Sequence, residues 1–143
     1  MNTNPKQLEN IESVIKIEQF DPSKHANELS SWYSFYNMGD LDLNKLPQYG
    51  LVAYNDISPL AILFICNSDC KIVWFDLIIG NPKADKDIRS KALDAVSDEM
   101  FIKAKEKGYT TILAASAIPA MIDRLAKQFK TCETKASLFM KEI

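Results

Sequence analysis

The spacing of hydrophobic and polar residues predicts a chain in which strands and helices alternate. Strands are expected where apolar residues alternate with polar ones or form short runs, and helices where apolar residues recur every three to four positions. The expected strands are residues 13–20, 51–55, 59–67, 71–79 and 109–116. The expected helices are residues 21–38, 86–107 and 118–129, with a short helix within 39–50 and a closing strand or hairpin over 131–143.

Capping residues support the helix boundaries. Asp21 is a good N-cap, and Pro22 stands in the first helical turn, where its missing N–H has no consequence. Gly108 follows the long helix, at the position where a glycine commonly ends one. The nearly continuous apolar run 71–79 predicts a central strand that is covered on both faces. The element order therefore predicts an α/β (α+β) fold, with a mixed, largely antiparallel sheet of six to seven strands and helices on both faces.

Length and charge narrow the classes of protein that fit. A chain of 143 residues suits one domain, expected over 11–143 after a flexible tail at 1–10. The net charge of −2 argues against a nucleic-acid partner, which favours a basic surface. The sequence has no apolar run of the ~20 residues that a bilayer span needs, and its polar start lacks a secretory signal. We therefore expect a cytoplasmic protein without a membrane partner.

The three cysteines are expected to be reduced thiols. Cys66 and Cys70 flank a turn, where a disulfide across a hairpin is conceivable, and Cys132 stands apart. An odd number of cysteines suits a reducing compartment better than a disulfide framework. No second cysteine pair and no nearby histidine completes a ligand set, so no metal is expected.

The segment that joins the run 71–79 to the long helix is the main candidate for chemistry. A strand that enters a helix through a loop often holds a phosphate, because the N–H groups at a helix N-terminus bind anions. This loop has one glycine, Gly80, and carries positive charge at Lys83, Lys86 and Arg89, with Asp85 and Asp87 between them. Two interpretations stay open: an anion-binding loop, and an acidic helix start that satisfies its own dipole and binds nothing.

The element order and several segments resemble the GNAT family, the Gcn5-related N-acetyltransferases. The resemblance covers most of the chain from Val14 to Ile143 and includes "LIIGNPKADKDIRSKALDAV", which is similar to the family's fourth strand, coenzyme A loop and third helix. In the family pattern Gln/Arg-x-x-Gly-x-Gly/Ala, Asp85 takes the Gln/Arg position, and Ile88 and Ser90 take the glycine positions. Ala117 and Arg124 stand near the family's frequent asparagine and tyrosine.

The resemblance implies acetyl-CoA as the cosubstrate. It implies that backbone groups of Ile78, Ile79 and Gly80 pair with the pantetheine arm. It also implies that the loop around Ile88 and Ser90 holds the pyrophosphate, with cationic contacts from Lys83, Lys86 and Arg89. Ser116 or Tyr109 is a candidate donor to the leaving thiolate.

Asp76 is the candidate general base. It interrupts the apolar run 71–79, and a lone acid there must find a partner or shift its pKa upward. A structural acid at a strand edge is the alternative. His25, the one histidine, is expected to be a surface side chain. Aromatic residues around the first helix are expected mainly in the core, or in an acceptor pocket.

Two functions follow from the resemblance. The first is transfer of an acetyl group from acetyl-CoA directly to an amine of a small molecule or protein. The second is an inactive GNAT-like domain that serves as an interaction or assembly module, similar to compact phage-encoded members. A homo-oligomer is left open by both.

Overall fold

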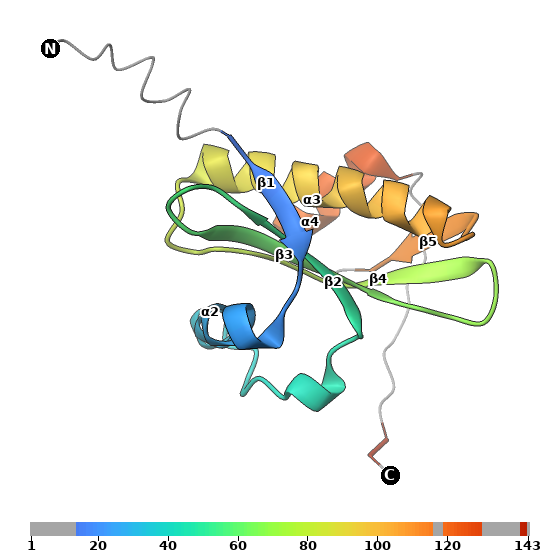
Figure 1. Cartoon of the computed structure of the whole chain (residues 1–143), viewed down its shortest axis with the longest axis horizontal. Coiled ribbons are helices and arrows are strands. Elements are labelled where there is room, and N and C mark those ends of the chain that lie inside the picture. The colour runs from blue at the N-terminus through green and yellow to red at the C-terminus, as the bar shows by residue number, and fades with distance from the viewer. Residues whose placement is uncertain (1–13, 116–118, 130–140, 143) are drawn as a thin grey trace, which may run out of the picture. The chain divides into compact units, whose positions relative to one another are not determined.

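The computed structural model describes residues 14–115, 119–129 and 141–142 (Figure 1). Two compact units divide the chain, Met1–Leu113 and Ala114–Ile143. The elements in chain order are β1 (Lys16–Gln19), α2 (Pro22–Phe35), the 3-10 helix η1 (Leu43–Lys45), β2 (Tyr49–Tyr54), β3 (Pro59–Cys66), β4 (Ile72–Gly80), α3 (Lys86–Glu106), β5 (Thr111–Ala114) and α4 (Pro119–Gln128).

The strands form one sheet in the order β1-β2-β3-β4-β5, in which the pairs β1/β2, β2/β3 and β3/β4 are antiparallel. Figure 1 shows α2 and α3 on opposite faces of this sheet. The predicted fold class is confirmed. The described part of the chain has five strands where six to seven were expected, and most of the predicted closing strand lies outside the described residues.

The helix α2 covers one face of the sheet through its apolar side. It begins as predicted, because the Asp21 carboxylate accepts the Ser23 N–H at 2.9 Å. Leu29 and Trp32 are at most 1% exposed and pack into a core cluster with Val52, Ile62, Phe64 and Ile79. Burial of a large aromatic side chain such as Trp32 is a major contribution to stability.

The helix α3 covers the other face. Ala92, Val96, Met100 and Ala104 recur every four residues and are buried, which is the spacing of one helix stripe. The ring of Phe101 stacks on that of Phe75 in β4, with 5.5 Å between the ring centroids. Gly108, with a φ of 91°, follows the helix as predicted.

The expected short helix within residues 39–50 is present as the 3-10 helix η1. One prediction about local structure is wrong. The strand β4 is not covered on both faces, because Ile72, Trp74 and Asp76 are exposed while Val73 and Phe75 are buried. The first half of β4 therefore alternates between exposed and buried side chains. The sequence does not show this alternation, because Trp74 is an apolar residue that is exposed.

Candidate active site at the end of β4

The loop after β4 is anchored by the buried side chain of Asn81, which is 6% exposed. Its Nδ2 donates to the Pro59 carbonyl oxygen at 2.8 Å, and its Oδ1 accepts the Lys83 N–H at 2.9 Å. The first contact fixes the loop to the beginning of β3, and the second holds the turn of the loop itself. We did not predict this role from the sequence, although Asn-Pro after an apolar run is a turn signal.

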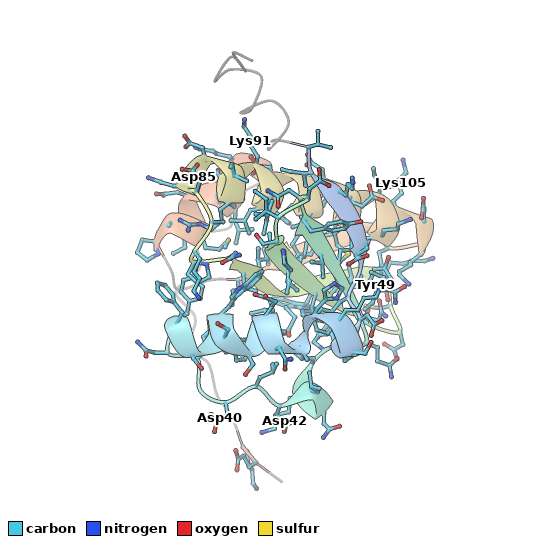
Figure 2. All side chains as sticks on the ribbon, turned by 60° about the vertical axis from the view of Figure 1, so that its left-hand side comes forward. Asp40, Asp42, Tyr49, Asp85, Lys91 and Lys105 are labelled. Carbon is cyan, nitrogen blue, oxygen red and sulfur yellow. The ribbon has the colours of Figure 1, made fainter. Side chains whose placement is uncertain are left out.

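The N-terminus of α3 is occupied by a carboxylate of the chain itself. The Asp85 Oδ1 accepts the Asp87 N–H at 2.9 Å and the Ile88 N–H at 3.4 Å. Asp85 is exposed and stands at the beginning of α3 (Figure 2), while Lys86, in the first turn, is also exposed. These amides therefore bind an oxyanion, and the oxyanion present is the capping side chain.

Arg89 lies inside the loop and not on its outer surface. Its Nη1 donates to the carbonyl oxygens of Asn81 and Ala84, both at 3.4 Å. Its Cδ lies so close to Gly80 that a Cβ added there would meet it at 2.8 Å. Gly80 is thus needed for close packing of Arg89, and Arg89 braces the loop. Arg89 was one of three predicted cationic contacts to a ligand. The other two, Lys83 and Lys86, have exposed side chains.

A cleft of about 430 Å³ lies beside this loop. Three segments line it: α2 with Glu28, Ser31 and Trp32, the turn between β2 and β3, and the loop from Asn81 to Asp85 together with Ile88. Its volume is in the range of small-molecule sites. The cleft therefore places the predicted anion-binding loop next to a space that a ligand can fill.

The carbonyl of Gly80 faces away from β3 and is also occupied. The Asn81 N–H donates to the Leu60 oxygen of β3 at 2.8 Å, and the two ends of a trans peptide point in opposite directions. The Gly80 oxygen on the far side accepts the Tyr36 hydroxyl at 3.0 Å. This contact was not predicted, since the aromatic residues of α2 gave only a packing signal.

The last residues of β4 extend past β5. The Thr111 N–H at the beginning of β5 donates to the Lys71 oxygen at 3.2 Å, and β5 has 4 residues while β4 has 9. β5 therefore runs beside the first part of β4 only. Of the residues expected to meet a pantetheine arm, Ile78 is half-buried and Ile79 is buried in the core.

Asp76 is the extra residue of a bulge in β4. Phe64 pairs with Leu77 and the next residue, Ile65, pairs with Phe75, so Asp76 has no partner in β3. Bulges turn a side chain away from the regular pleat. The Asp76 carboxylate is exposed, and its hydrogen bond with the Cys66 thiol is one of the contacts that raise the pKa of Cys66, after burial.

Tyr33 on α2 lies close enough to sense the same carboxylate. Burial raises the pKa of the Tyr33 hydroxyl, and the negative charge of Asp76 raises it further. Both neighbours, Cys66 and Tyr33, therefore stay neutral at physiological pH. Among the described residues, no lysine, arginine or histidine forms an ion pair with Asp76. The exposed carboxylate thus lies within electrostatic range of a thiol and a phenol.

Other predicted residues lie elsewhere or outside the described residues. His25 is not a surface side chain, because it is 5% exposed; its Nδ1 accepts the Asp21 N–H at 2.9 Å and its Nε2 contacts Glu18 Oε1 at 2.8 Å. Tyr109 donates to Asn67 at 3.2 Å in the turn before β4. Ser116 lies outside the described residues, and Ser90 is half-buried. Cys66 and Cys70 are free thiols, which was the expected state of both.

The described residues contain no group of three or more His, Cys, Asp or Glu side chains that is arranged to hold a metal ion. None of the helices in this part of the chain is both long enough and apolar enough to cross a bilayer.

By sequence, the chain matches no family model and no curated protein. Its fold is similar to that of solved acetyltransferases. One is an aminoglycoside acetyltransferase from an uncultured soil metagenomic sample, in complex with sisomicin, with a TM-score of 0.70, 13% identity, and coverage of 95% of this chain and 99% of that chain. A second is a ribosomal-protein-alanine N-acetyltransferase from Brucella melitensis, with a TM-score of 0.65, 15% identity, and 90% and 99% coverage.

A third is a GNAT-family acetyltransferase from Streptococcus pneumoniae, with a TM-score of 0.60, 11% identity, and 90% and 100% coverage. These likenesses cover nearly the whole of each chain. At such low identity they establish the shared fold. The predicted resemblance to the GNAT fold is therefore confirmed.

Proposed function

We propose that this chain, which has the fold of the GNAT acetyltransferases, transfers an acetyl group from acetyl-CoA to an amine. The observation that carries the proposal is the position of Asp76. The bulge in β4 turns this exposed carboxylate out of the sheet, just before the stretch of β4 that β5 does not accompany. A carboxylate at the border of an open strand edge can take a proton from an amine that binds there.

Two contacts test whether the residues present fit coenzyme A. The amides of Asp87 and Ile88 already bind one oxyanion, and the Gly80 carbonyl already accepts one hydroxyl. A pyrophosphate oxygen and a pantetheine amide are groups of the same two kinds. Asp85 is exposed and Tyr36 is 39% exposed, so both side chains have room to turn away. The residues therefore fit coenzyme A once these two side chains move.

We propose that backbone amides and two lysines hold coenzyme A. The amides at the start of α3, from Lys86 to Ile88, would take the pyrophosphate, and the exposed ammonium groups of Lys83 and Lys86 would lie near its charge. Backbone groups of Ile78 to Gly80 would pair with the pantetheine arm. Arg89 would keep the loop in shape from inside, since both of its contacts are to loop carbonyls.

The transfer needs a base and a donor of protons. Asp76 takes a proton from the bound ammonium, which leaves a neutral amine. The nitrogen lone pair forms the bond to the acyl carbon, the carbon–sulfur bond breaks with its electrons going to sulfur, and a second nitrogen proton ends on the thiolate. A backbone N–H of residues 78–80 is the proposed donor to the oxyanion. Ser116 is kept as the proposed donor to sulfur.

The contacts of Asp85 and Tyr36 also favour a second candidate function. If Asp85 and Tyr36 hold their positions permanently, the loop is a closed, self-satisfied structure, and the domain serves as an interaction module. The negative charges of Asp85 and Asp87 at the start of α3 stabilise the empty helix. In this case the chain binds a protein partner or a second copy of itself.

Ligand-induced stabilisation separates the two functions. At 100 times its dissociation constant, acetyl-CoA is expected to raise the free energy of unfolding by ~2.7 kcal/mol, because it binds the folded chain only. The measurement is a thermal shift with millimolar acetyl-CoA, and the matched control is adenosine alone, which lacks the pyrophosphate and the thioester. If the melting temperature stays unchanged with acetyl-CoA, the transferase proposal fails, and sizing of the purified chain for an oligomer tests the module.

A further inference from the structure

An exposed indole lies on the same face of the sheet as Asp76. Trp74 is 46% exposed, an unusual state for the largest side chain in the protein. Trp74 pairs with Cys66 across β3 and β4, so both side chains point to one face. Because side chains two residues apart in a strand share a face, Cys66 is on the face of Phe64, which belongs to the core cluster under α2.

Four side chains on this face form what we name the acceptor wall: Tyr33, Cys66, Trp74 and Asp76. Cys66 connects the group, because it pairs with Trp74 in β4 and lies close enough to the Asp76 carboxylate for that carboxylate to raise the pKa of its thiol, after burial. Tyr33 enters from α2, half-buried against the core cluster, and its hydroxyl senses the charge of Asp76. The wall thus combines one anionic group with two aromatic surfaces.

The wall lacks a positive charge of its own. No described cationic side chain forms an ion pair with Asp76, and burial keeps the pKa of both the Cys66 thiol and the Tyr33 hydroxyl raised. An anionic group between neutral and aromatic neighbours favours a cationic ligand. Indole is the aromatic ring that holds a cation best, over distances up to ~6 Å from its centre.

We propose that the acceptor wall binds a small aliphatic polyamine, with one ammonium at Asp76 and a second over the indole of Trp74. This inference rests on the proposed function and names its acceptor class. A single ammonium would use Asp76 alone and leave the indole exposed, whereas a diamine or triamine uses both. The methylene segment between the two ammonium groups would lie against the apolar face of the wall.

The two tryptophans make the binding directly measurable without acetyl-CoA. Trp32 is 1% exposed and Trp74 is 46% exposed, so a ligand at the wall changes the emission and quenching of Trp74 alone. Titration of the full chain with spermidine is expected to give a saturable change in fluorescence. Trp74→Phe should abolish this change, and calorimetry of the same variant reports the affinity that remains.

Variants of the wall test where the polyamine binds. Asp76→Asn and Trp74→Ala are each expected to weaken spermidine binding about tenfold by calorimetry, and n-butylamine, with one ammonium, should bind the native chain at least tenfold more weakly than spermidine. Asp69→Asn is the matched control, since it removes the same charge from the turn before β4. Far-ultraviolet circular dichroism of each variant shows whether it is folded.

The proposal is overturned if spermidine gives no saturable change in the native chain. It is also overturned if Asp69→Asn weakens binding as much as Asp76→Asn, because the attraction is then general to the negative surface. The outcomes are separable from those of the proposed function. Spermidine binding without a thermal shift from acetyl-CoA would refute the transferase and retain the wall, and a shift without spermidine binding would do the reverse.

Discussion

Replacing Asp76 by asparagine is expected to lower acetyl-transfer turnover about 10²- to 10⁴-fold. Asparagine keeps the size and the polarity of the side chain but cannot accept the proton of the ammonium. The thermal shift caused by acetyl-CoA should stay unchanged, since Asp76 precedes the strand edge proposed for the pantetheine arm. Steady-state turnover with a polyamine acceptor and thermal shift of the same preparation measure the two effects.

The control for this prediction is Asp69→Asn, which removes the same charge from an exposed position in the turn before β4 and leaves the acceptor wall intact. Its turnover is expected to stay within about threefold of the native value, because the base itself is intact. Asp76→Asn with native turnover would exclude Asp76 as the base. A loss of both turnover and acetyl-CoA binding would instead show that Asp76 shapes the strand.

Replacing Asp85 by asparagine is expected to tighten coenzyme A binding about 5- to 100-fold. Asparagine is as good an N-cap as aspartate, so the helix start is retained while the charge is removed. A like charge about 6 Å from a phosphate costs about 1–3 kcal/mol, depending on its exposure. Isothermal titration calorimetry with coenzyme A measures the gain directly.

Asp98→Asn is the matched control for Asp85→Asn. Asp98 is exposed on the same helix more than three turns away, so the change in net charge is identical while the helix start is untouched. An equal gain in both variants would show a general charge effect. An unchanged affinity in Asp85→Asn would contradict the idea that its carboxylate competes with the pyrophosphate.

The elements of the fold were predictable because each carries a local signal. Asp21 and Pro22 mark the start of α2, and Gly108 marks the end of α3. The bulge at Asp76 was not predictable, since it is a property of the pairing between β3 and β4 and not of either sequence alone. The exposure of Trp74 was not predicted for a related reason. An apolar run does not show whether another element of the fold covers each of its side chains.

The position of the candidate site was predictable from the sequence, but several of its contacts were not. The order of strand, loop and helix placed an anion-binding loop after Gly80, and the acidic residues were recognised as a possible satisfaction of the helix dipole. Two details depend on contacts between distant segments. The bond from Tyr36 to Gly80 joins residues 44 positions apart, and the inward turn of Arg89 depends on the carbonyls of Asn81 and Ala84.

The hydrogen bond from Tyr36 to Gly80 has a consequence for how the two proposed ligands influence each other. Tyr36 is the C-cap of α2, and Tyr33 of the acceptor wall lies one turn earlier on the same helix. We expect a cosubstrate that takes the Gly80 carbonyl to release Tyr36 and thereby to shift Tyr33. Thermodynamic linkage then requires that each ligand changes the affinity for the other by the same factor.

This coupling is expected to disappear in Tyr36→Phe, which keeps the ring and removes the hydroxyl. Calorimetric titration of spermidine with and without saturating coenzyme A, and of coenzyme A with and without saturating spermidine, gives the two factors. A factor that differs from one in the native chain, together with a factor of one in Tyr36→Phe, would show that α2 connects the two sites. A factor of one in the native chain would show that the sites are independent, and an unchanged factor in Tyr36→Phe would show that this hydrogen bond does not couple them.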